Sequence, residues 1–240
     1  MASNNDPIAV WWERRWQERR AEARQVDWAT TASQADAIVA ILDLTPGQRI
    51  LDIACGAGAL DVELATRGLV VTGLDICPAA LEIARSLAEE RSAHANWICA
   101  DMRDLPLGPF DAILLWDVLF GILPSDAENQ RVLNGAARIL CPGGRFYLEV
   151  YTKEFALRHG VEGNLVYSPD SDSFVSSGGE RRLLPMRLYT GDALERMLES
   201  AGLRVIAEKG WGWRGDPPGP PYRGRTVIST GEDSPVRQAP

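Results

Sequence analysis

A change from apolar to glycine-rich sequence near residue 50 constrains the fold of this chain more than any other feature. Residues 50–60 read ILDIACGAGAL, in which an apolar run ends in an acidic residue and two glycines follow, one residue apart. This pattern is typical of a strand–loop–helix unit whose backbone comes close to a bound nucleoside. Because Gly56 and Gly58 lack a Cβ, the loop can adopt positive φ angles and leave room for a ligand.

A second apolar run, residues 69–74, ends at Asp75. The spacing from the glycine loop allows the Asp75 carboxylate to accept hydrogen bonds from ribose hydroxyls. The two runs together predict a binding site for a small molecule that contains adenosine.

The residue at position 61 helps to decide which adenosine-containing cofactor the site binds. A dinucleotide fingerprint has a third glycine there, whereas this chain has Asp61, with Glu63 close behind. Two carboxylates in the first turn of a helix suit the helix dipole but would repel a pyrophosphate. Asp52, one turn before the glycines, can face a cation. A ligand with ammonium and sulfonium charges and no phosphate therefore fits better than NAD.

Five segments, in order along the chain, resemble the motifs of the class I S-adenosylmethionine (SAM) dependent methyltransferases. Residues 52–58 resemble motif I, Asp75 the ribose-binding acid, residues 99–106 the third motif, residues 110–119 the fourth strand, and residues 140–150 the fifth strand with its preceding turn. The resemblance implies SAM as cofactor and S-adenosylhomocysteine (SAH) as product. It implies a cofactor site formed by Asp52, Ala54, Gly56, Ala57, Gly58, Asp75, Ile76, Asp101, Met102 and Trp116.

Composition agrees with a small-molecule enzyme. The 240 residues carry a net charge of −8, which argues against a nucleic-acid footprint. No apolar run approaches the ~20 residues of a membrane span, and the N-terminus lacks the pattern of a secretory signal. The four cysteines have no metal-ligand spacing. We expect a cytoplasmic enzyme with a small-molecule substrate and no metal, nucleic-acid or membrane partner, either a monomer or a homodimer.

Alternating strand and helix patterns predict an α/β fold, a Rossmann-like, doubly wound, seven-stranded and mostly parallel sheet. Helices are expected over residues 7–26 and 31–44. The expected divisions are an N-terminal helical cap (1–44), a SAM-binding core (45–151), a β-rich, lid-like insertion after strand five (152–189), the C-terminal part of the core sheet (190–230) and a flexible tail (231–240).

Residues for substrate binding and proton transfer follow less directly from the sequence. A general base is needed only if the nucleophile must lose a proton, and the candidates are His159, Asp117 and Glu149. Aromatic and basic residues near the expected mouth of the site are candidates for substrate contacts, namely Trp28, Phe120, Tyr151, Arg187, Tyr189 and Trp211. The acceptor atom, O, N, C or S, stays open because a fold does not fix a substrate.

Several alternatives remain at this point. The same scaffold could bind SAM and catalyse a cyclisation or decarboxylation, or it could be an accessory protein that only holds SAM. The signature Asn/Asp-Pro-Pro-Tyr of base and glutamine N-methyltransferases is absent after the fourth strand, where residues 116–119 read WDVL. The N-terminal helix, with Ile8, Trp12 and Trp16 recurring four residues apart, either fastens to the domain or closes over the cofactor.

Overall fold

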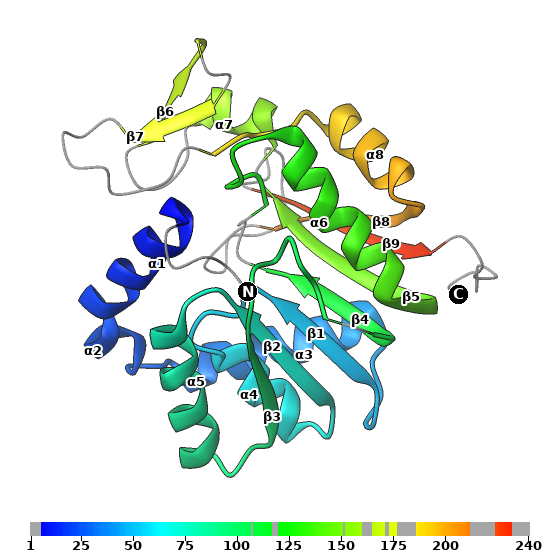
Figure 1. Cartoon of the computed structure of the whole chain (residues 1–240). Coiled ribbons are helices and arrows are strands. Elements are labelled where there is room, and N and C mark those ends of the chain that lie inside the picture. The colour runs from blue at the N-terminus through cyan, green and yellow to red at the C-terminus, as the bar shows by residue number, and fades with distance from the viewer. Residues whose placement is uncertain are drawn as a thin grey trace.

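A central sheet with helices on both faces forms the core of the protein in a computed structural model (Figure 1). The structure describes residues 6–106, 108–116, 120–150, 152–159, 165–170, 173–176, 186–211 and 224–231. In this part of the chain, no helix is both long enough and apolar enough to cross a membrane.

The central sheet is mostly parallel and has the strand order β3-β2-β1-β4-β5-β9-β8. Strands β1 to β5 are parallel to one another, whereas β9 runs antiparallel to both β5 and β8. The order reverses between β1 and β4, which is where open α/β sheets bind ligands. The strands are β1 (Arg49–Ile53), β2 (Val70–Asp75), β3 (Ala95–Cys99), β4 (Phe110–Leu115), β5 (Leu140–Val150), β8 (Leu203–Trp211) and β9 (Gly224–Gly231).

The two faces of the sheet pack against different helices, as the alternation along β4 shows. Ile113 and Leu115 join a core cluster with α6 and α8, whereas Ala112 and Leu114 join a cluster with α3 and α4. This arrangement is the expected doubly wound, Rossmann-like one. The helices are α1 (Pro7–Glu18), α2 (Arg20–Ala23), α3 (Trp28–Leu42), α4 (Ala59–Thr66), α5 (Pro78–Glu90), α6 (Asp126–Ile139), α7 (Lys153–His159) and α8 (Gly191–Ser200).

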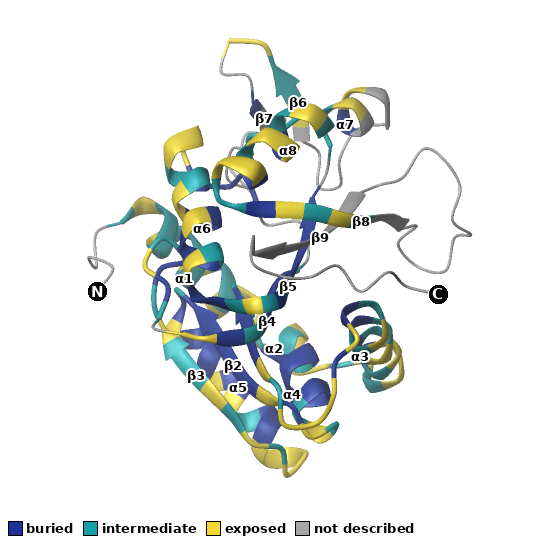
Figure 2. Ribbon diagram, turned by 90° about the vertical axis from the view of Figure 1, so that its right-hand side faces the viewer, coloured by how far each residue is buried: buried dark blue, intermediate teal, exposed yellow. Residues whose placement is uncertain are grey.

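The N-terminal helices differ from their predicted bounds. The helix expected over residues 7–26 is interrupted at Arg19, whose φ and ψ of −100° and 8° are not helical. Helix α3 begins at Trp28, three residues before the start of the helix expected over residues 31–44. It begins there because the Asp27 side chain accepts a hydrogen bond from the backbone N–H of Thr30 and caps the helix. In Figure 2 the central strands are mostly buried, whereas α1 carries no buried residue.

The insertion expected over residues 152–189 begins with a helix, α7, for which the sequence analysis gave no separate expectation. A separate two-stranded antiparallel sheet follows, made of β6 (Leu165–Ser168) and β7 (Ser173–Ser176). Residues 177–185 of the expected insertion lie outside the described residues, and Tyr189, at its end, forms an isolated bridge with Thr152. The expected tail also lies outside the described residues, apart from Gly231 at the end of β9.

Candidate functional site

A cavity of about 390 Å³ lies at the carboxyl ends of β1, β2 and β4, where the strand order reverses. All ten residues predicted to hold the cofactor line this one cavity: Asp52, Ala54, Gly56, Ala57, Gly58, Asp75, Ile76, Asp101, Met102 and Trp116. They converge because the ends of parallel strands meet at one edge of a sheet, although the residues are spread over 65 positions (Asp52 to Trp116).

The glycine loop takes a left-handed backbone at three positions, since φ is 62° at Ala54, 57° at Gly56 and 66° at Gly58. A Cβ on Gly58 would lie 2.6 Å from Cζ3 of Trp97, so only glycine fits there. The loop is fastened to β2 by a hydrogen bond from the backbone N–H of Cys55 to the carbonyl of Leu74, 3.0 Å long. These features place the backbone of the glycine loop on the wall of the cavity.

Asp75 is held at the end of β2 by two backbone donors. Its Oδ2 accepts from the N–H of Gly56 at 2.9 Å, and its Oδ1 accepts from the N–H of Cys77 at 2.8 Å. Burial raises the pKa of the Asp75 carboxyl, while these two hydrogen bonds oppose the rise. A carboxylate offers about four lone-pair sites, so Asp75 keeps acceptor capacity for the hydroxyls of a ligand.

To repel a bound pyrophosphate, Asp61 and Glu63 would have to face the cavity, and in the structure they do not. Neither lines the cavity: Asp61 is fully buried, and its Oδ2 would be 2.6 Å from a Cβ on Gly73. Glu63 pairs with Arg67 and Arg91, both at 2.7 Å. The expectation that these two carboxylates face a ligand is therefore wrong.

Burial raises the pKa of the Asp61 carboxyl to about 7, although the neighbouring side chains of Asp52 and Cys55 oppose the rise. The Cys55 thiol has a pKa well above its usual value, because it is buried and Asp61, Asp52 and Asp75 are close by. A cluster of acids therefore lies behind and beside the glycine loop.

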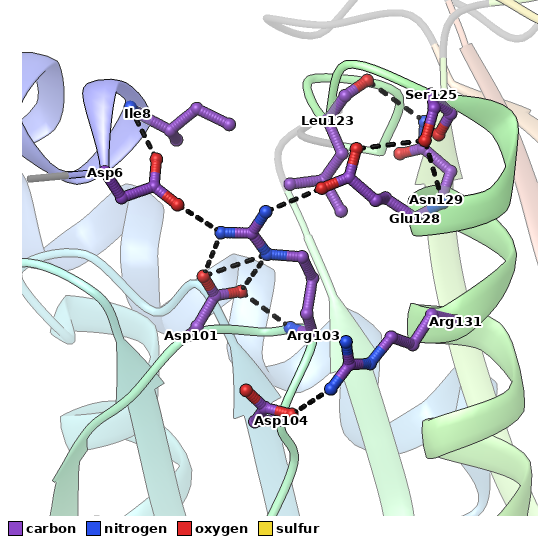
Figure 3. A network of polar contacts seen from close by, with 10 residues as sticks. All are labelled: Asp6, Ile8, Asp101, Arg103, Asp104, Leu123, Ser125, Glu128, Asn129 and Arg131. Atoms are coloured by element: carbon purple, nitrogen blue, oxygen red, sulfur yellow. Dashed lines mark hydrogen bonds and ion pairs between the residues drawn. The ribbon is translucent and has the colours of Figure 1, made fainter. Parts of the chain in front are cut away.

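Asp101 belongs to a network centred on Arg103, which Figure 3 shows. The Arg103 guanidinium donates to both oxygens of Asp101, to Glu128 at 2.7 Å and to Asp6. Asp6 caps α1 by accepting from the N–H of Ile8 at 2.8 Å. At the start of α6, the backbone N–H of Glu128 donates to the Ser125 hydroxyl, which caps the helix, and that hydroxyl donates to the Glu128 carboxylate. The three carboxylates raise the pKa of Arg103.

Helix α1 forms one wall of the cavity, and the sequence analysis had not named any of its residues as part of the cofactor site. Ile8, Trp12 and Trp16, spaced four apart, line the cavity together with Arg19. Glu13, on the same helix, lies 2.9 Å from the sulfur of Cys77, which donates to it. The four-residue spacing of Ile8, Trp12 and Trp16 in the sequence indicated that these side chains share one face of a helix. The helix both packs on the domain and covers the site.

The charges of the described cavity residues favour a cationic ligand. Asp52, Asp75 and Asp101 are buried acids, and Arg19 is the one basic residue among the described residues that line the cavity. Most of the other lining residues are apolar or aromatic, with Thr31 and Gln34 as polar exceptions. Trp116, at the end of β4, stacks on Tyr147 with ring centroids 5.7 Å apart.

The candidate bases are only partly within the described structure. Asp117 lies outside the described residues, as does Tyr151, a candidate for substrate contacts. His159 is the last residue of α7, and its side chain is not described. Glu149 is buried on β5 and does not line the cavity.

Three of the residues predicted to contact the substrate, Phe120, Arg187 and Tyr189, lie close together, but outside the cavity. Tyr189 packs on Phe120, with ring centroids 5.6 Å apart, and donates to Asp126 at 2.8 Å. Arg187 pairs with the same Asp126 at 2.6 Å. These three candidates form one cluster, and none of them lines the cavity. The side chain of Trp211 lies outside the described residues.

Trp28 is not at the site, and this prediction is corrected. Since Asp27 starts α3 early, Trp28 packs against the side of α5, with the guanidinium carbon of Arg91 4.6 Å from its ring centroid. Its neighbours there are Val62 and Leu87.

Comparison with known proteins agrees with this geometry. A family described as "Methyltransferase domain" matches residues 50–144. A ubiquinone biosynthesis O-methyltransferase of Coxiella burnetii is 29% identical over 111 residues, which are 45% of this chain and 46% of the relative. A methyltransferase of Synechocystis is 37% identical over 109 residues, which are 45% of this chain and 49% of that protein. The chain thus spans about half the length of the curated relatives it matches.

Solved structures extend the likeness of fold to most of the chain. The magnesium protoporphyrin IX methyltransferase of Synechocystis, solved with bound SAH, superposes with a TM-score of 0.67 at 18% identity. The superposition covers 93% of this chain and 98% of that one.

Proposed function

We propose that this chain is a class I SAM-dependent methyltransferase that transfers the methyl group of SAM to a small molecule and releases SAH. The match of residues 50–144 to the family described as "Methyltransferase domain" supports the proposal. The observation that carries this proposal is the convergence of all ten predicted cofactor residues on one cavity at the switch point of the sheet. When bound, SAM supplies an electrophilic methyl group on a sulfonium centre.

The residues of the cavity fit this cofactor part by part. Asp75 would accept the ribose hydroxyls, and Asp101 with Met102 would hold the adenine. The backbone of Gly56 and Gly58, which lines the cavity, would contact the methionine portion, next to the negative charge of Asp52. Trp116 would lie by the sulfonium. Three buried acids around a ligand with two cationic groups and one carboxylate give favourable electrostatics in a site shielded from water.

The chain's main contribution to the reaction would be to orient the two reactants. Methyl transfer is an in-line displacement, and well-aligned reactants can gain ~7–11 kcal/mol from proximity and orientation. Ile8 and Trp12 on α1, with Ile122 and Leu123, give the cavity apolar walls that would exclude water from the reacting atoms. His159, Asp117 and Glu149 remain our candidates for a base where the acceptor must lose a proton.

A small-molecule acceptor is supported by the acidic charge of −8 and by relatives whose names refer to ubiquinone and magnesium protoporphyrin IX. We propose further that the segment after strand five, with α7, β6 and β7, contributes to the substrate side of the site as a lid. A SAM-dependent cyclase or decarboxylase, or a SAM-binding accessory protein, would share the cofactor residues. Formation of SAH with an acceptor separates these from a methyltransferase.

Titration calorimetry of the purified chain with SAH, with NADH as the control ligand, tests the cofactor assignment. Micromolar binding of SAH and no heat with NADH are expected. Binding of NADH, or no binding of SAH, would overturn the proposal.

A further inference from the structure

Arg103 lies at the junction of three elements, two of which, α1 and the loop after β3, border the cavity, although Arg103 does not line the cavity itself. It contacts the cap of α1 through Asp6, the loop after β3 through Asp101, and the first turn of α6 through Glu128 (Figure 3). Asp6 and Arg103 are 97 positions apart in the sequence. No motif of the chain predicts this contact.

We propose that Arg103 is a positioning residue that fastens the start of α1 over the cofactor cavity and couples that closure to cofactor binding by sharing Asp101 with the adenine. The coupling rests on the proposed function, because Asp101 is assigned to the adenine only there. The fastening of α1 does not depend on that assignment.

Helix α1 needs such a fastening. None of its residues is buried, and Ile8, Trp12 and Trp16 face the cavity, so part of their apolar surface would contact cofactor rather than protein. A helix of 12 residues is marginally stable by itself in water and depends on tertiary contacts. The position of α1 should therefore respond to its attachments and to the ligand beneath it.

The Arg103 link is better shielded than the other ion pairs of this region. The side chains of Arg103 and Asp6 are 18% and 19% exposed, whereas the pairs Arg20–Glu82 and Arg24–Glu90, which tie α2 to α5, are about half exposed. Exposed ion pairs contribute little, while a shielded, hydrogen-bonded guanidinium contributes more to geometry and stability.

The Asp101 carboxylate can accept hydrogen bonds from Arg103 and from an adenine at the same time. One guanidinium faces three carboxylates, so the acceptor sites outnumber its five N–H donors. Arg103 approaches Asp101 through Nε and Nη2 and also donates its backbone N–H to Oδ1 at 2.8 Å, which fixes the carboxylate. The exocyclic amine of an adenine is a donor that such a fixed, negatively charged acceptor can bind.

The first experiment uses the variant Asp6→Asn, because asparagine caps a helix as well as aspartate does but lacks the charge that binds Arg103. Helices α1 and α2 and their flanking residues hold five trypsin sites, at Arg14, Arg15, Arg19, Arg20 and Arg24. Without ligand, Asp6→Asn should be cleaved there at least three times faster than the wild type, and saturating SAH should narrow the difference. The matched control is Asp27→Asn, the same change at the cap of α3, and it should be cleaved at the wild-type rate.

The second experiment measures SAH affinity by calorimetry at a temperature where every variant is folded. Arg103→Gln should weaken binding at least tenfold, Asp6→Asn about threefold, and Arg103→Lys should recover part of the loss. A purely structural role for Arg103 would lower the melting temperature but leave SAH affinity and SAH-dependent protection unchanged, and that result would overturn the coupling. Wild-type cleavage of Asp6→Asn would overturn the fastening. If the wild type fails to bind SAH, the proposed function and the coupling that rests on it fail together, while cleavage without ligand still decides the fastening.

Discussion

The indole ring of Trp16 lies over Gly56, so close that a Cβ on residue 56 would approach the ring's Cζ2 atom to 2.9 Å. The contact joins α1 to the glycine loop, two parts of the chain 40 positions apart. Gly56 also has a φ of 57°. Glycine is therefore required at this position for two separate reasons, its backbone conformation and its closeness to α1.

Gly56→Ala tests both reasons when it is compared with Gly47→Ala. Gly47 also has a positive φ, 91°, but a Cβ there would meet nothing within 4 Å. Gly47→Ala should lower the free energy of unfolding by about 1 kcal/mol through backbone strain alone. Gly56→Ala should lower it by about 1 kcal/mol more and should weaken SAH binding, since the indole must move. Urea denaturation measures the free energies, and an equal loss in the two variants would contradict a role for the Trp16 contact.

Asp75→Asn should weaken SAH binding at least tenfold. The ribose hydroxyls would lose a charged acceptor, worth roughly 1.5–3 kcal/mol, and the new amide would face the N–H of Gly56 or of Cys77. Calorimetry with SAH is the measurement. Asp111→Asn is the matched control, because Asp111 also accepts a backbone N–H, that of Arg49 at 2.7 Å, at the opposite end of the sheet. Equal affinity in Asp75→Asn and wild type would contradict the ribose assignment.

The sequence could predict which residues converge on the cavity because the signals for them are local. The acid, the glycines and the strand ends lie within short stretches, and the topology of a parallel sheet brings strand ends together without further information. Asp52, Asp75 and Asp101 reach one cavity for this reason.

The contacts that the sequence did not predict depend on packing between distant segments. The cap at Asp27 fixes where α3 begins and so turns Trp28 toward α5. Asp61 follows the helical pattern of α4, but the space left by Gly73 on β2 lets its side chain point inward. The link between Asp6 and Arg103 joins two loops whose approach depends on where α1 lies. No local sequence pattern predicts these three contacts, because each depends on how distant segments pack together.

Ala54→Gly should stabilise the protein. Ala54 has a φ of 62°, a conformation that costs an L-residue about 1–2 kcal/mol, whereas glycine costs only the added freedom of the unfolded chain. The free energy of unfolding should rise by about 0.5–1 kcal/mol. Ala57→Gly, in the same loop but without a positive φ, should instead lower it by a similar amount. Urea denaturation of both variants is the test, and a loss of stability in Ala54→Gly would contradict the strain.

Asp61→Asn should change how stability depends on pH. Burial raises the pKa of Asp61 to about 7 in the folded protein, whereas the pKa is about 3.9 in an unfolded chain. Between these values the folded protein holds a proton that unfolding releases, so the Asp61 contribution is complete below about pH 4 and is lost as the pH rises through about 7.

The asparagine variant has no such proton. Relative to Asp61→Asn, the wild type should lose about 1 kcal/mol or more of unfolding free energy between pH 4 and pH 8, since one unit of pKa shift corresponds to about 1.4 kcal/mol. Urea denaturation of both proteins across this range measures the difference. Parallel curves would show that Asp61 is ionised at neutral pH, and the buried carboxyl beneath the glycine loop would then add a negative charge to the cofactor site.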